Sequence, residues 1–178
     1  MPLTWIAVLC VARRSPYLAL ENVELFSQER DALTFKGGMP VVAHPPCAQW
    51  SRMRGLSRRS LVEAWLGPFC YEQVRLNGGV LEHPAHSQLW SYLGIKPLVV
   101  SARWFGFPAE KPTGLWFNRC EPGPIPYSLD ASSAVVATSK RGVRQLLPVL
   151  AAGQRSLTAP AMAAWLVAAA RSVDSTHT

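Results

Sequence analysis

Short apolar runs of strand length alternate with helical segments along most of the chain, and this alternation limits the possible folds more than any other feature. The strand-like runs lie at residues 5–12, 40–43, 79–84, 98–107 and 113–117. Apolar residues at helical spacing predict helices at 61–76, 87–93 and 158–173, and a further helix is expected over 18–29. The alternation favours an α/β fold in which a mostly parallel sheet is flanked by helices.

The length of the chain favours a single compact domain. Its 178 residues, about half of them apolar, are enough for one hydrophobic core and too few for two comfortable domains. We therefore expect one domain over residues 1–178, with a disordered tail at 172–178. Gly78 and Gly79 should end the helix over 61–76, because glycine accepts the left-handed conformation at a helix C-terminus.

The cysteines and the amino-terminal segment favour a cytoplasmic protein. The four cysteines form no C-x-x-C pair, and a chain of this size does not need disulfide bonds to be stable. The apolar run at residues 5–12 is too short to span a bilayer, and its arginines follow it, whereas those of a signal peptide precede it. We expect no association with a membrane.

The charge of the chain favours a polyanionic partner. The formal net charge is +7, from 18 Lys and Arg against 11 Asp and Glu, and Arg outnumbers Lys. Arg side chains match the geometry of phosphate oxygens, and their binding releases counterions from DNA. The alternative is a basic surface that only keeps the protein soluble.

Two strand ends carry residues suited to catalysis. Cys47 follows Pro45 and Pro46 at the end of the run at 40–43, and Glu82 lies near the end of the run at 79–84. The carboxyl ends of parallel strands meet at one edge of a sheet, where active sites collect. The prolines fix the backbone before the cysteine, and cationic neighbours or a helix start would lower the pKa of its thiol. The alternative is a buried structural cysteine behind a Pro-Pro bend.

Residues around these strand ends are candidates for contacts to a nucleic acid. We expect Arg52 and Arg54 to bind phosphates and Trp50 to stack on a base, unless this segment is only a solvated charged turn. Substrate contacts are also expected from His44, Pro46, Ser51, His83 and His86, although the last two histidines would equally suit loop packing. The order of histidine, glutamate and cysteine differs from that of zinc deaminases, so we expect no metal.

Four motifs in the same order give the chain a resemblance to known proteins. They are "HPPC" at 44–47, "EHP" at 82–84, "ARWFGFPAEKPTGLWF" at 102–117 and "QRSLTAPAMAAWL" at 154–166. The chain resembles short phage-type DNA methylase-like proteins, which are related to the catalytic core of DNA cytosine-5 methyltransferases. The resemblance implies a reduced Rossmann-like methyltransferase core in the cytoplasm of a bacterial host. It also implies catalytic roles for Cys47 and Glu82, and site roles for Arg103, Glu110, Lys111, Thr113 and Arg155.

The resemblance implies an enzyme that modifies a pyrimidine of DNA at carbon 5. Cys47 would add to carbon 6, and Glu82 would limit the negative charge on the ring. The family holds S-adenosylmethionine with a glycine-rich turn, but no glycine precedes Gly37 here. We therefore expect an amine, such as an amino acid, to be attached to an activated 5-hydroxymethyluracil of phage DNA. The alternatives are an S-adenosylmethionine-dependent cytosine-5 methyltransferase and a non-catalytic DNA-binding module.

Overall fold

The strands form one mixed six-stranded sheet with the order β2-β1-β3-β4-β6-β5. The computed structural model describes residues 4–12, 14–27, 31–51, 61–130, 132–135 and 147–173. Strands β2, β1, β3 and β4 are parallel, whereas β6 is antiparallel to both β4 and β5. The bounds are β1 Ile6–Val11, β2 Val23–Ser27, β3 Val41–Ala43, β4 Gly79–Pro84, β5 Leu98–Ser101 and β6 Pro112–Asn118.

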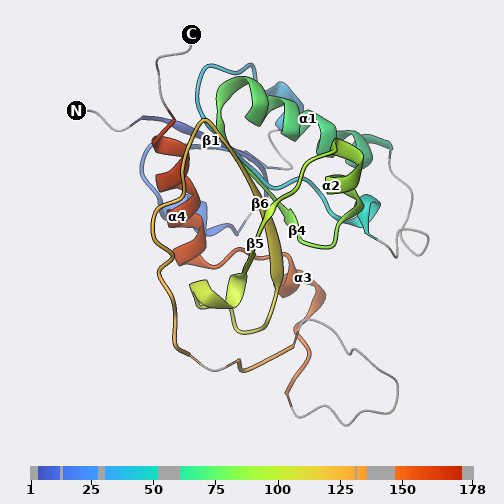
Figure 1. Cartoon of the computed structure of the whole chain (residues 1–178), viewed down its shortest axis with the longest axis vertical. Coiled ribbons are helices and arrows are strands. Elements are labelled where there is room, and N and C mark those ends of the chain that lie inside the picture. Colours follow the sequence, from blue (N-terminus) through green and yellow to red (C-terminus); the bar gives the residue numbers. More distant parts are fainter. Residues whose placement is uncertain are drawn as a thin grey trace.

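Helices cover both faces of the sheet (Figure 1). They are α1 Leu61–Asn77, α2 Gln88–Leu93, α3 Ala152–Arg155 and α4 Pro160–Arg171, with short 3-10 helices at η1 Pro16–Ala19, η2 Ala32–Thr34, η3 Ala48–Trp50 and η5 Ala102–Phe105. The α/β domain with flanking helices is thus confirmed. The sheet is mixed: three of its five strand pairings are parallel, as expected for a mostly parallel sheet, and the last strand β6 enters antiparallel between β4 and β5.

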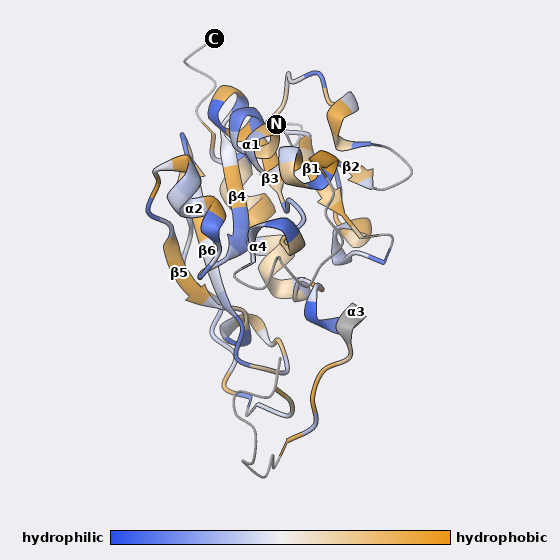
Figure 2. Cartoon of the chain, turned by 90° about the vertical axis from the view of Figure 1, so that its right-hand side faces the viewer, coloured by the Kyte–Doolittle hydropathy of each residue, from blue (hydrophilic) through white to orange (hydrophobic). Residues whose placement is uncertain are grey.

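Alternate residues of the central strands build two separate cores. Val8, Val42 and Val80 pack with α4 residues on one face. Ala43 and Leu81 pack with α1 residues on the other. Because side chains alternate along a strand, a site residue on β4 must point either to the α4 face or to the α1 face. In Figure 2, β4 changes from apolar to hydrophilic colours towards its carboxyl end.

The helix expected over residues 18–29 is wrong. The segment instead contains part of η1 and the strand β2, which pairs in parallel with β1. Asn22 adopts a positive φ of 52° immediately before β2, which ends the preceding turn. The apolar spacing of this segment fits either a helix or a strand, and pairing with the largely buried β1 decides for the strand. The run at 98–107 is likewise a strand only to Ser101, whose side chain caps the 3-10 helix that follows.

A close approach of two backbones brings β3 against β4. Gly79 has a φ of 118°, and a Cβ atom on it would lie 2.0 Å from the carbonyl oxygen of Val41. Only glycine fits this position without displacing β3. Just before it, Gly78 ends α1 with a φ of 77°, as the sequence predicted. At the other end of the chain, Ser172 and Val173 of the predicted tail are described, and residues 174–178 lie outside the described part.

Candidate functional site

Cys47 and Glu82 lie at the carboxyl ends of the neighbouring parallel strands β3 and β4. The register pairs Ala43 with Leu81, so the next residues along, His44 and Glu82, lie side by side. Pro45 is buried and turns the chain, and Cys47 begins η3 at the rim of a pocket that Glu82 also lines. A buried proline with a fixed φ holds this turn in one conformation.

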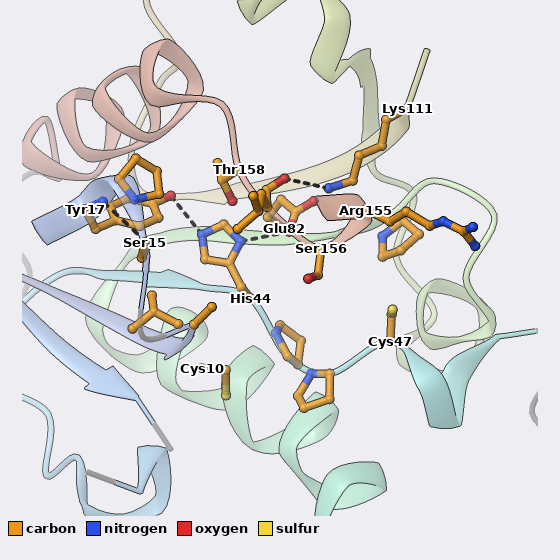
Figure 3. A pocket seen from close by; sticks show the side chains of 17 residues that line it. Cys10, Ser15, Tyr17, His44, Cys47, Glu82, Lys111, Arg155, Ser156 and Thr158 are labelled. Carbon is orange, nitrogen blue, oxygen red and sulfur yellow. Dashed lines mark hydrogen bonds and ion pairs between the residues drawn. The ribbon is translucent and has the colours of Figure 1, made fainter. Parts of the chain in front are cut away.

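The site contains a chain of three hydrogen-bonded side chains (Figure 3). The Tyr17 hydroxyl lies 2.8 Å from Nε2 of His44, and Nδ1 of His44 lies 2.8 Å from Oε2 of Glu82. The side chains of His44 and Glu82 are 12% and 15% exposed, and Tyr17 is 1% exposed. Tyr17 comes from η1, so the chain joins the segment after β1 to the ends of β3 and β4.

The pocket around these three side chains has a volume of about 230 Å³ and collects residues from five parts of the sequence. Of the residues predicted for the site, it contains His44, Pro46, Cys47, Glu82, Lys111 and Arg155. The pocket is also lined by Thr158 and by residues to which the sequence reasoning gave no site role, among them Cys10, Ser15, Tyr17 and Ser156. Thr158 belongs to the resembled carboxyl-terminal motif, but no local signal marks Tyr17, which a tertiary contact brings to His44.

Two basic side chains line the pocket. Nζ of Lys111 donates a hydrogen bond of 3.0 Å to the carbonyl of Leu157 and lies 5.1 Å from the centre of the Phe107 ring. Nε of Arg155 donates a 2.8 Å hydrogen bond to the carbonyl of Leu150. Lys111 therefore joins the segment before β6 to the segment before α4. Its positive charge acts on Glu82, and Arg155 adds a second positive charge to the pocket lining.

The electrostatics of the pocket keep Glu82 ionised. Burial acts to raise the pKa of this carboxyl, but the hydrogen bond from His44, together with the positive charge of Lys111, outweighs burial. The pKa of Glu82 therefore lies below the usual glutamate value. At neutral pH, Glu82 accepts hydrogen bonds and protons, and its Oε1 has no hydrogen-bond partner among the described residues.

The same electrostatics act against the thiolate form of Cys47. Partial burial raises the pKa of the thiol, and the negative charge of Glu82 raises it further. The charge of Lys111 lowers it, but by less. The lowered pKa expected from the sequence is therefore wrong for the described part of the site. Arg52 and Arg54, which are expected to bind phosphates, lie outside the described residues.

Several predicted residues are near the pocket in sequence but do not line it. His83 is 1% exposed, points to the α1 face, and packs edge-on against Trp90, since it alternates with Glu82 along β4. Burial lowers the pKa of His83, and neither ring nitrogen makes a well-formed hydrogen bond, although the nearby Pro46 carbonyl favours its protonation. Trp50 packs against Tyr92, with ring centres 5.0 Å apart, so the expected base-stacking role is not supported.

The remaining predicted residues lie further from the Cys47 pocket. Arg103 and Glu110 form their own pair, 3.6 Å apart, and Glu110 also accepts a 2.6 Å hydrogen bond from Ser101. Thr113 is buried and donates to the carbonyl of Lys111, which fixes the start of β6. His86 is exposed and Ser51 is half-buried, and neither lines this pocket.

A second pocket of about 600 Å³ adjoins the first at the carboxyl ends of β1 and β2. The two share Cys10, Val11, Ala12 and Pro46 as walls. Its other lining residues include the acidic side chains of Asp31 and Glu63. Within the described ranges, no three histidine, cysteine or acidic side chains gather in a way that would hold a metal ion. No helix in this part of the chain has the length and apolar character needed to cross a bilayer.

Comparison with known proteins assigns no family to the chain. A scan against protein-family models finds no match, and a search of curated protein sequences finds none either. The function must therefore be inferred from the residues and their geometry.

Proposed function

We propose that the protein is a transferase that modifies a pyrimidine of DNA at carbon 5, with Cys47 as the nucleophile and Glu82 as the assisting carboxylate. One observation carries the proposal: Cys47, which follows β3, and Glu82, which lies near the end of β4, line a single pocket at the carboxyl edge of the sheet. Lys111 and Arg155 line the same pocket, and together with the net charge of +7 they suit a polyanionic substrate.

The chemistry needs a base flipped out of the duplex into the pocket. The Cys47 thiol loses its proton and its sulfur bonds to carbon 6, while the ring electrons move onto the carbon-4 oxygen. In a base that carries a pyrophosphorylated hydroxymethyl group, these electrons return and expel pyrophosphate, which leaves an exocyclic methylene. An amine adds to the methylene and loses a proton, and the ring then expels the sulfur. No methyl donor is needed.

The protonated state of Cys47 is compatible with this sequence of steps. Its raised pKa lowers the fraction of thiolate in the free protein. The carboxylate of Glu82 lines the same pocket, and a bound base that desolvates its oxygen Oε1 would raise the pKa of Glu82 and make it a stronger proton acceptor. The thiolate would then form only when the base fills the pocket and excludes water.

The two adjoining pockets support a reaction with two substrates. The smaller one contains Cys47 and Glu82, and the larger one would hold the group donor, since the shared wall of Cys10, Val11, Ala12 and Pro46 brings the two together. The acidic residues Asp31 and Glu63 of the larger pocket favour a cationic donor such as an amine. A non-catalytic DNA-binding module would not need a second pocket beside the cysteine.

The arrangement of the strands supports a reduced Rossmann-like core. The chain passes from β1 outwards to β2 and returns to β3 on the other side of β1, so the strand order reverses at β1 and β3. Ligands of open α/β sheets bind at such a reversal, beyond the carboxyl ends of the strands. Both pockets lie at this place.

The described residues after β1 do not fit the family's way of holding S-adenosylmethionine. Ala12, Ser15 and Pro16 take the place of a glycine-rich turn, and the buried side chain of Tyr17 lines the same pocket and contacts His44. A cytosine-5 methyltransferase remains the second proposal, because Cys47 and Glu82 would serve it equally. The two differ in the donor.

The test is the incubation of the protein with DNA that contains pyrophosphorylated 5-hydroxymethyluracil and a mixture of amino acids and diamines. We expect release of pyrophosphate and a new nucleoside whose mass equals that of the base plus an amine. Cys47→Ser should abolish both products while DNA affinity stays the same, and Cys120→Ala is the matched control, because Cys120 lies outside both pockets.

Parallel reactions with unmodified DNA and labelled S-adenosylmethionine separate the remaining proposals. Transfer of a labelled methyl group to cytosine would replace the amine transferase with the methyltransferase. If the protein binds DNA but forms neither product, and forms no covalent adduct with 5-fluoropyrimidine DNA, it is a binding module.

A further inference from the structure

Tyr17, His44 and Glu82 are linked by two hydrogen bonds, and only one placement of their protons gives each of the three groups a hydrogen-bond partner. Tyr17 is 1% exposed, and its hydroxyl has no partner other than His44 among the described residues. If the hydroxyl accepted a hydrogen bond from His44, its own proton would be buried without an acceptor, which is costly. The hydroxyl must therefore donate to Nε2.

This direction determines the tautomer of His44. A nitrogen that accepts a hydrogen bond carries no proton, so the single proton of the neutral imidazole lies on Nδ1. Nδ1 then donates to Oε2 of Glu82 at 2.8 Å. The other carboxylate oxygen of Glu82, Oε1, is then available to a substrate, and the hydrogen bond from the His44 ring fixes the orientation of the carboxylate.

We infer that Tyr17 and His44 are positioning residues, in which the tyrosine hydroxyl locks the histidine in its Nδ1-H form so that the histidine holds Glu82 ionised and correctly oriented in the pocket. This role for Glu82 rests on the proposed function. The lock itself concerns only the geometry of the folded protein. The sequence placed His44 among substrate contacts and gave Tyr17 no role.

The hydrogen bonds among Tyr17, His44 and Glu82 fix the orientation of these side chains and do not transfer a proton from Tyr17. Burial raises the pKa of Tyr17 well above its ordinary value, and the charge of Glu82 raises it further. Passing the phenol proton on would leave a buried tyrosinate near a carboxylate. The other charged or titratable groups that act on Glu82 are Lys111 and His83, and both favour its ionised form.

Nitrogen NMR of the full-length protein labelled with ¹⁵N-histidine tests the lock directly. At neutral pH, we expect Nε2 of His44 to resonate as a bare nitrogen and Nδ1 as a protonated one. Tyr17→Phe removes the donor to Nε2, so proton occupancy of Nε2 should rise. Tyr71→Phe is the matched control, because Tyr71 packs against Trp116 on the other face of the sheet, and it should leave the His44 signals unchanged. A protonated Nε2 in the unaltered protein would overturn the inference.

An activity measurement then tests the consequence for Glu82. With DNA modification as the readout, Tyr17→Phe should lower kcat by about 10-fold to 100-fold, by analogy with the hydrogen-bond partners that orient metal-ligating side chains, with KM for DNA unchanged. An unchanged kcat would show that the lock does not position Glu82. If the unaltered protein modifies no DNA, the proposed function fails, and the NMR result still decides the lock.

Discussion

Replacement of His44 by alanine tests how much the central hydrogen-bonded chain contributes to the stability of the fold. His44→Ala removes the donor to Oε2 of Glu82 and the acceptor of the Tyr17 hydroxyl, each of which lies 2.8 Å from the ring. Removing the hydrogen-bond donor to a buried carboxylate costs about 1.5–3 kcal/mol, and an unpaired buried hydroxyl costs about 1–3 kcal/mol. Water reaches Glu82, whose side chain is 15% exposed, so we expect a total loss near the low end, about 3 kcal/mol.

The loss should depend on pH in a defined direction. In the unaltered protein the pKa of Glu82 is below the unfolded value of 4.5, so its contribution is present above that pH and is lost as the pH falls through the folded pKa. Without His44, burial acts with less opposition and the pKa of Glu82 rises. Glu82 of the folded variant therefore takes up a proton more readily than in the unaltered protein. The loss in free energy of unfolding caused by His44→Ala should be largest at about pH 8 and smaller towards about pH 5.

Urea denaturation followed by tryptophan fluorescence at these two pH values measures both effects. We expect the difference in the free energy of unfolding to narrow by about 1.4 kcal/mol for each unit by which the pKa of Glu82 in the variant exceeds about 5. His86→Ala is the control, because His86 is exposed, and it should change stability by less than about 0.5 kcal/mol. A loss below about 1 kcal/mol for His44→Ala, or one that is the same at both pH values, would refute the reasoning.

Three further outcomes follow from other parts of the structure. Gly79→Ala should destabilise the protein by more than about 2 kcal/mol in thermal or urea unfolding, because φ is 118° and the new Cβ would lie 2.0 Å from the Val41 carbonyl oxygen; a mild effect would mean that β3 moves easily. Cys47 should react slowly with iodoacetamide at neutral pH, and Glu82→Gln should speed the reaction by removing a charge that raises the pKa of the thiol; a slower reaction would contradict this account. Ser87→Ala removes the cap of α2 and should cost about 1 kcal/mol of unfolding free energy, whereas an unchanged midpoint would show that the cap is dispensable.

Local sequence patterns were enough to predict the elements that position the candidate site. The apolar runs gave β1, β3, β4 and β6, and the helical spacing gave α1, α2 and α4 to within a few residues. In these segments the pattern of apolar residues is clear enough to identify a helix or a strand without knowledge of the neighbouring segments. The meeting of Cys47 and Glu82 in one pocket was also predictable, since each follows or ends a parallel strand. The roles assigned to them remain predictions.

The alternation along β4 was present in the sequence but was not used. Glu82 and His83 are consecutive residues of a strand, so they must point to opposite faces. This rule alone would have separated the carboxylate in the pocket from the histidine that packs against Trp90.

Only the tertiary structure decided the features that depend on contacts between distant segments. The segment at 23–27 is a strand because β1 offers it a partner, and β6 is antiparallel because of where the chain returns to the sheet. Tyr17 meets His44 across 27 residues of sequence. The pKa of Cys47 rises because burial and the charge of Glu82 act together. The residues next to Cys47 in the sequence show the neighbouring cations, but they show neither its burial nor its proximity to Glu82. Strand periodicity is a property of one segment, whereas burial and electric field arise only when the segments pack together.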